Sequence, residues 1–172
     1  LQNQDILATS GDITLKGGQR GTKFTSAGAR LGSKPGSSIT ASSSDILIQG
    51  DIFTVDTLSS GFVSSVSTTG SVTIEPFSDS FPSSHTLSPN LTLPASNGGL
   101  TIGKESNTSD ITVSQSLTVA GQISLYGTDI NINQNIVSTG NQLYDGNVFI
   151  DSDNVTLESY SGSITINGDV GN

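Results

Sequence analysis

Aliphatic residues return at every second position in short runs along most of this chain. In a typical run, Gly162-Ser-Ile-Thr-Ile, two aliphatic residues enclose a polar one and a glycine precedes them. Because successive side chains of a β-strand point to opposite faces, each run predicts a strand of about four or five residues with one buried face. The alternating pairs are Ile13/Leu15, Ile46/Ile48, Val72/Ile74, Leu100/Ile102, Ile111/Val113, Leu117/Val119, Ile123/Leu125, Ile130/Ile132, Val148/Ile150, Val155/Leu157 and Ile164/Ile166.

These runs recur at nearly even intervals, as the positions of Gly99, Gly121 and Gly146 in front of three of them illustrate. Good helix formers are scarce, and Gly, Asn or Asp lies between successive runs. A period of about 20–25 residues, built from short strands and tight turns, is typical of a β-solenoid. We therefore expect an all-β chain of about seven coils that stack strand on strand in parallel.

A β-sandwich is the main alternative, because it also contains short strands at intervals of about 8–12 residues. It needs hairpin turns, and the clearest signals for these are only Asp145-Gly146 and Asn167-Gly168. We expect residues 1–172 to form one solenoid segment that is looser or richer in loops at residues 16–37 and 75–96. The latter segment holds four of the five prolines and the only histidine, His85, which we interpret as a loop residue.

The composition agrees with a narrow core. Hydrophobic residues make up 32% of the chain and aromatic residues 5%, whereas serine and threonine together account for 50 of the 172 residues. A compact globule of this length usually has more apolar mass, but a solenoid needs only a thin aliphatic column. Cysteine is absent, so stability has to come from stacking. Methionine is also absent, and we interpret the chain as an internal fragment or a processed product.

The charges are unevenly distributed around a net charge of −9. This acidic balance argues against nucleic acid and against an anionic membrane surface as partners, and no run approaches the ~20 apolar residues of a membrane-spanning helix. Five of the six basic residues lie between Lys16 and Lys34, namely Lys16, Arg20, Lys23, Arg30 and Lys34. This basic stretch is either a solvated loop or a contact surface for an acidic partner, an acidic glycan or the acidic part of another copy.

The second half of the chain resembles a known type of repeat. The similar phrases are Leu100-Thr-Ile-Gly-Lys, Asp110-Ile-Thr-Val, Leu117-Thr-Val-Ala-Gly-Gln-Ile-Ser-Leu-Tyr-Gly, Asp129-Ile-Asn-Ile-Asn and Gly162-Ser-Ile-Thr-Ile-Asn. They resemble the repeats of very large bacterial exoproteins of the filamentous-haemagglutinin type, which are secreted through an outer-membrane partner, and of related giant adhesins. The first half resembles these repeats only loosely. The resemblance implies a right-handed parallel β-helix, export across two membranes, and display on the cell surface or release from it.

Candidate catalytic chemistry is sparse. Parallel β-helices also host enzymes that cleave acidic polysaccharides, and Asp151 and Asp153 lie two positions apart near Asp145. Such cleavage needs a base or a cation beside the carboxylates, and no lysine, arginine or histidine follows Lys104. The oxygen-rich segment around Asp145, Asp151 and Asp153 leaves a structural calcium ion open as an alternative to solvated carboxylates.

Two further surface patterns have competing interpretations. Tyr126, Tyr144 and Tyr160 follow one another at intervals slightly shorter than one expected coil. They either close the ends of the core or stack on one face as a sugar platform. Asn131, Asn133 and Asn135 suggest a stacked amide ladder or a series of turns rather than a ligand set.

We therefore expect a non-catalytic structural or adhesive shaft of a bacterial cell-surface or secreted exoprotein that serves adhesion, display, or fibre and matrix formation. No catalytic, cofactor or metal site is assigned. The expected partners are receptors or glycans on host or neighbouring cells, or other copies of the chain. The expected location is extracellular or at the bacterial outer-membrane surface. A carbohydrate-binding or polysaccharide-degrading β-helix module remains the alternative.

Overall fold

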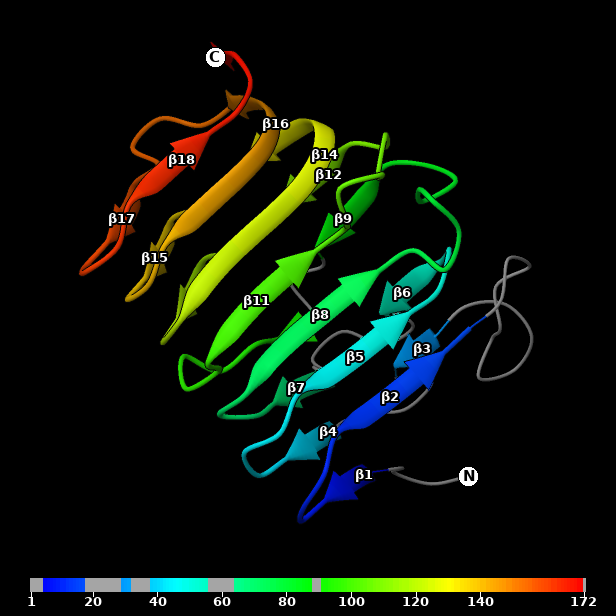
Figure 1. The fold of residues 1–172 in the computed structure, drawn as a ribbon. Coiled ribbons are helices and arrows are strands. Elements are labelled where there is room, and N and C mark those ends of the chain that lie inside the picture. Colours follow the sequence, from blue (N-terminus) through cyan, green and yellow to red (C-terminus); the bar gives the residue numbers. More distant parts are fainter. Residues whose placement is uncertain (1–4, 18–28, 32–37, 56–63, 88–90, 172) are drawn as a thin grey trace.

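The computed structural model describes residues 5–17, 29–31, 38–55, 64–87 and 91–171, and in these ranges all regular secondary structure is β (Figure 1). The expected all-β class is therefore confirmed. The described residues contain no long apolar helix of the kind that crosses a membrane.

The described residues form short strands separated by bends and turns. Most strands have two to five residues, whereas β14 and β16 have 11 and nine. The strands are β1 (Asp5–Ala8), β2 (Ile13–Lys16), β3 (Ala29–Leu31), β4 (Ser38–Ala41), β5 (Ile46–Gln49), β6 (Phe53–Val55), β7 (Ser64–Ser67), β8 (Ser71–Glu75), β9 (His85–Leu87), β10 (Leu91–Thr92), β11 (Gly99–Ile102), β12 (Ile111–Val113), β13 (Leu117–Val119), β14 (Gln122–Ile132), β15 (Ile136–Ser138), β16 (Gln142–Ile150), β17 (Leu157–Ser159), β18 (Ile164–Ile166) and β19 (Val170–Gly171).

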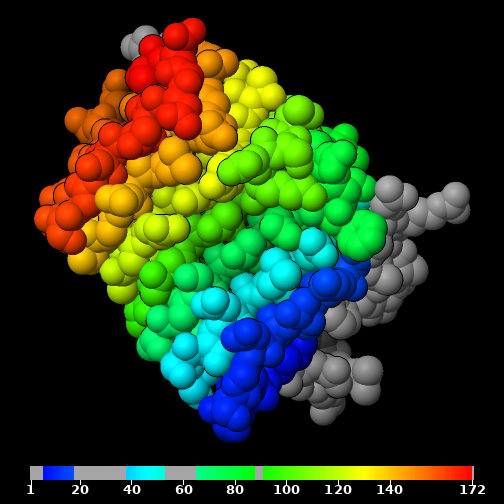
Figure 2. Space-filling model, viewed as in Figure 1, coloured from blue at the N-terminus to red at the C-terminus, as the bar shows by residue number. Residues whose placement is uncertain are grey.

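The strands pair in parallel, as expected. The longest path runs through seven strands in the order β2-β5-β8-β11-β14-β16-β18. Its register joins Ile13 to Ile46, Ile46 to Val72, Val72 to Leu100, Leu100 to Ile123, Ile123 to Gln142 and Gln142 to Ile164. Each strand thus hydrogen-bonds to a strand one repeat later in the chain, and Figure 2 shows the repeats as successive bands from blue to red.

The repeat length changes along the chain. From β11 onwards the paired residues of this path are 23, 19 and 22 positions apart, close to the expected interval. Before β11 they are 33, 26 and 28 positions apart, so the expected interval is too short for the first half. A parallel ladder constrains only the strands, and lengthening a connection costs little additional loop entropy.

Shorter strands lie before and after those of the main path in the chain. Those that precede it form two separate sheets, β1-β4-β7-β10 and β13-β15-β17. Of those that follow it, β3 pairs with β6, and β9 pairs with β12. β12 also pairs with the second half of β14, and β19 pairs with the second half of β16. The mutual register of β14 and β16 shifts between Tyr126 and Asp129.

The alternating aliphatic residues form continuous buried columns. The inward positions of the main path are Ile13, Ile46, Val72, Leu100 and Ile123, followed by the fully buried Gln142. In the next inward column Leu125 is likewise followed by a fully buried residue with a polar group, Tyr144. At the last repeat Ile164 is 41% exposed and Val170 is 62% exposed, since no described strand covers β18 or β19.

A column of glycines marks the bend before the main path. A Cβ atom on Gly121 would collide with the carbonyl oxygen of Gly98, so only glycine lets successive bends approach this closely. The bends stack in the order Gly70, Gly98, Gly121, Gly140 and Gly162. This stacking explains why the same Gly-x-aliphatic-x-aliphatic phrase recurs in the sequence.

Asp and Asn side chains join one bend to the next. Asp45 Oδ1 accepts a hydrogen bond from the backbone N–H of Ser71 at 2.8 Å, and Asp12 Oδ1 accepts one from the N–H of Asp45 at 3.1 Å. On another edge Asn147 donates to Asp129 at 3.0 Å and accepts from the N–H of Asp169 at 3.1 Å. Three of these four bonds satisfy backbone N–H groups at the bends, and the bond from Asn147 Nδ2 to Asp129 joins two side chains.

Candidate functional site

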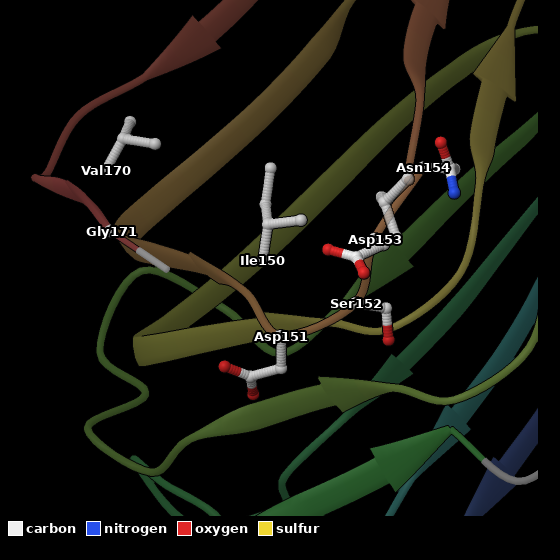
Figure 3. Close-up of a pocket in the computed structure, with 8 residues that line it drawn as sticks. Ile150, Asp151, Ser152, Asp153, Asn154, Val170 and Gly171 are labelled. Atoms are coloured by element: carbon white, nitrogen blue, oxygen red, sulfur yellow. The ribbon is translucent and has the colours of Figure 1, made fainter.

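One hollow with polar side chains lies beside the turn that follows β16 (Figure 3). It has a volume of about 720 Å³. Asp151, Ser152, Asp153 and Asn154 reach it from the turn, and Val170 and Gly171 lie opposite on β19. Asn154 has a φ of 67°, a left-handed conformation that asparagine tolerates, and it lets the chain reverse here.

This hollow does not assemble the carboxylates that the sequence suggested. Asp151 and Asp153 are both exposed and share one turn, whereas Asp145 lies within β16 and accepts a hydrogen bond from Asn167 Nδ2 at 2.9 Å. Among the described residues no three His, Cys, Asp or Glu side chains are grouped so that they would hold a metal ion. The lining supplies carboxylates but neither an imidazole nor a cationic side chain.

A second hollow lies on the outer face of the main path, across three successive strands. Gln122, Ser124 and Tyr126 line it from β14, Leu143 from β16 and Thr165 from β18. Asn141 and Ser163 line it from the bends directly before β16 and β18. We call it the β14–β18 groove, and its volume is about 490 Å³. None of its lining residues is charged, although the whole chain carries a net charge of −9.

Strand register builds this groove from positions that are distant in sequence. Ser124 pairs with Leu143, and Leu143 pairs with Thr165, so these three outward side chains form one row across the strands. Asn141 is held at the bend because its Oδ1 accepts a hydrogen bond from the N–H of Ser163 at 2.9 Å. Side chains on paired strands are more rigidly placed than side chains on loops, which favours a defined binding surface.

Tyr126 supplies the aromatic ring of the groove. Its side chain is half-buried on the outer face of β14. In the preceding repeat the neighbouring position is Gly103, whose missing Cβ would lie 3.3 Å from the Cβ of Tyr126. Gly103 therefore places no side chain against this flank of the tyrosine.

The three tyrosines do not share a face, which excludes the alternative of a row of exposed rings as a sugar platform. Tyr144 points inward and is fully buried, Tyr126 is half-buried on the outer face, and Tyr160 is 70% exposed after β17. The register pairs Tyr126 with Asp145 rather than with Tyr144, and this difference of one position turns Tyr144 to the opposite face. Burial raises the pKa of the Tyr144 phenol well above its usual value.

His85 is not the loop residue that the proline-rich segment suggested. It lies in strand β9, is buried, and pairs with Ile111 of β12 in a column that is otherwise aliphatic. Its ring stacks on Phe81, with ring centroids 4.5 Å apart and planes inclined by 14°. Burial lowers the pKa of His85 to about 4, so the imidazole is neutral at neutral pH.

The remaining sequence features have mixed outcomes. In the basic stretch Lys16 to Lys34, Lys16 is exposed on β2, whereas Arg20, Lys23 and Lys34 lie outside the described residues.

The asparagines of residues 131–135 form no amide ladder, since Asn131 pairs with Thr112 and Phe149. Asn133 and Asn135 flank a bend at Gln134 before β15, whereas Asn131 lies in β14.

Comparison with known proteins found no matching family model, no similar curated protein and no similar solved structure. The candidate site therefore rests on the geometry of this chain. Of the two hollows, only the β14–β18 groove combines an aromatic ring, amides and hydroxyls on one rigid surface.

Sequence reasoning missed the groove, although a signal for it was present. Counting from the glycines of the stacked bends, Gly121, Gly140 and Gly162, places Gln122 beside Asn141 and Ser163. The same alignment places Gln142 level with Ile123 and Ile164, where an inward residue is required. A search for aliphatic pairs overlooked β16 at this end because its inward residues are Gln142 and Tyr144.

Proposed function

We propose that this chain is the non-catalytic shaft of a bacterial cell-surface or secreted exoprotein, folded as a right-handed parallel β-helix. The shaft holds a functional region away from the cell and takes part in adhesion, display or fibre formation. The observation that carries the proposal is the parallel register that continues through seven strands from β2 to β18 over buried aliphatic columns.

This arrangement supports a mechanical role for a physical reason. Each repeat satisfies the backbone hydrogen bonds of the next, and the inward columns exclude water along the axis of stacking. Stiffness is therefore obtained without disulfides, in agreement with the absence of cysteine. Small outward residues such as Thr14, Thr73 and Thr101 leave the surface free for contacts with partners.

Spin labels test the stacking directly, because the chain contains no cysteine that would compete with introduced ones. One outward column contains Thr14, Leu47, Thr73 and Thr165. Thr165 is six strands from Thr14, five strands from Leu47 and four strands from Thr73. With strands about 4.8 Å apart, labels on Thr14/Thr165, Leu47/Thr165 and Thr73/Thr165 should be separated by roughly 29, 24 and 19 Å. Distances that do not fall in such steps would overturn the β-helix, and an experimentally determined left-handed winding would overturn its handedness.

Location is tested on intact cells that produce the protein. Antibodies raised against this chain are expected to label the cells without permeabilisation, or to detect the chain in the medium. Labelling that requires broken cells would contradict the proposed extracellular role. The proposed partners are receptors or glycans on host or neighbouring cells, or other copies of the chain.

A further inference from the structure

We propose that the β14–β18 groove binds a neutral oligosaccharide. This inference rests on the adhesive role proposed above and deepens it by naming the ligand class and the surface that takes it. Sugars present hydroxyl groups together with apolar C–H faces. A site for them needs hydrogen-bonding side chains beside an aromatic ring, in a hollow large enough for a small ligand.

The groove supplies both kinds of contact. The half-buried ring of Tyr126 offers an apolar flank at one end. Gln122 and Asn141 contribute amides, which both donate and accept, and Ser163 and Thr165 contribute exposed hydroxyls. The volume of about 490 Å³ lies within the range typical of small-ligand sites.

Electrostatics selects neutral sugars over acidic ones. The groove has no charged lining residue, and no lysine or arginine occurs in the sequence after Lys104. The nearest carboxylate in the register is that of Asp145, which pairs with Tyr126 on the neighbouring strand. A uronate or sulfate group would therefore meet a negative potential without a compensating cation.

The groove is also ordered before a ligand arrives. Most of its side chains project from β14, β16 and β18, which are joined in parallel ladders. Asn141 lies in the bend before β16 and is fixed by the hydrogen bond that its Oδ1 accepts from the N–H of Ser163. Little conformational entropy remains to be lost on binding, which favours affinity for a weakly interacting sugar. The acidic hollow beside Asp151 and Asp153 lacks such a combination, because it contains no aromatic ring.

The experiment measures binding of the 172-residue chain to an array of neutral oligosaccharides and, in parallel, to uronate-containing and sulfated ones. Each neutral sugar that binds is then titrated into wild type, Tyr126→Ala, Gln122→Ala and Tyr160→Ala, and its dissociation constant is measured by saturation-transfer NMR. Tyr160→Ala is the matched control, since it removes an exposed tyrosine outside the groove. We expect neutral sugars to bind, Tyr126→Ala to weaken binding about tenfold or more, Gln122→Ala to weaken it less, and Tyr160→Ala to leave it unchanged.

Several outcomes overturn the inference. These are no binding of neutral sugars at millimolar concentration, equal loss in Tyr126→Ala and Tyr160→Ala, or preference for sulfated and uronate-containing sugars. If Tyr126→Ala fails to fold, Gln122→Ala and the sugar-induced chemical-shift changes of the Tyr126 ring protons in the wild type decide the question. The spin-label distances do not depend on sugar binding, so failure of this inference is distinguishable from failure of the proposed shaft.

Discussion

The hydroxyl of Tyr144 donates a hydrogen bond to Oε1 of Gln142 at 2.7 Å, and both side chains are fully buried. In the neighbouring repeats the paired inward positions hold Ile123 and Leu125 on one side and Ile164 and Ile166 on the other. Gln142 Nε2 in turn donates to the carbonyl oxygen of Glu158 at 2.6 Å. A polar bridge therefore interrupts two inward columns that are aliphatic in the repeats on either side, and its cost is offset because its members are hydrogen-bonded to one another.

Removing one member of this bridge should destabilise the chain. Tyr144→Phe leaves the buried Gln142 Oε1 without the hydrogen bond from the tyrosine hydroxyl. We expect the free energy of unfolding, measured by urea denaturation, to fall by roughly 1–3 kcal/mol. Tyr160→Phe, at an exposed position, should change it by less than about 0.5 kcal/mol. Equal effects of the two substitutions would contradict the structural role of the bridge.

Asn107 should contribute more to the free energy of unfolding than its position in a turn suggests. It is buried, its Oδ1 accepts from the N–H of Phe81 at 3.1 Å, and its Nδ2 donates to the carbonyl oxygen of Tyr126 at 2.7 Å. It thus joins the repeats that precede and follow its own. Asn107→Ala is expected to lower the free energy of unfolding by about 2–4 kcal/mol, because buried backbone groups lose their partners.

The matched control for Asn107 is Asn167→Ala, which removes an exposed hydrogen bond to Asp145. Its expected cost is within about 0.5 kcal/mol, since water replaces the lost partner. Thermal unfolding followed by circular dichroism compares the two variants. If Asn167→Ala is as destabilised as Asn107→Ala, the bond across three repeats is not what stabilises this edge.

The glycine column predicts which glycines tolerate a side chain. In Gly121→Ala the new methyl group would meet the Gly98 carbonyl, and backbone has to shift to admit it. We expect loss of several kcal/mol of stability, or no folded protein. Gly171→Ala is the control, because there the new Cβ would meet the edge of the Phe149 ring at 3.1 Å, a side chain that can move aside. Similar melting temperatures for both variants would refute the close stacking of bends.

His85 should make stability depend on pH in a defined window. Its pKa is lowered from 6.5 to about 4 in the folded state, so between these values the unfolded chain binds a proton that the folded chain does not. Stability is therefore fully present above pH 6.5 and is lost as the pH falls towards 4, with an expected total of about 3 kcal/mol. Urea unfolding between pH 4 and 7 measures this loss.

The comparison for His85 is the variant His85→Leu, which keeps an apolar side chain against Phe81 but does not titrate. Carboxylates contribute the same pH dependence to both proteins, so the difference between their curves isolates the imidazole. Curves that run parallel from pH 7 to pH 4 would show that burial of His85 does not govern the acid sensitivity.

Residues that obey a local rule were predictable. Ile13 and Leu15, or Ile123 and Leu125, reveal a strand and its buried face by alternation alone, and Gly121 reveals a bend. His85, Gln142 and Tyr144 were misjudged or overlooked because each takes an aliphatic position and is a polar residue there. Their burial depends on partners such as Phe81, Ser138 and Glu158, which alternation within a strand does not reveal.

Side-chain alternation and glycine at the bends were enough to predict the all-β class and most core residues, and the spacing of the runs favoured parallel stacking. The length of each early repeat, the inward position of Tyr144 and the meeting of Tyr126 with Asn141 and Thr165 in one groove became known only from the folded chain. The cause is the pairing register, because hydrogen bonds between repeats determine which outward residues become neighbours, and a slip of one residue in the pairing would turn the outward residues of a strand inward.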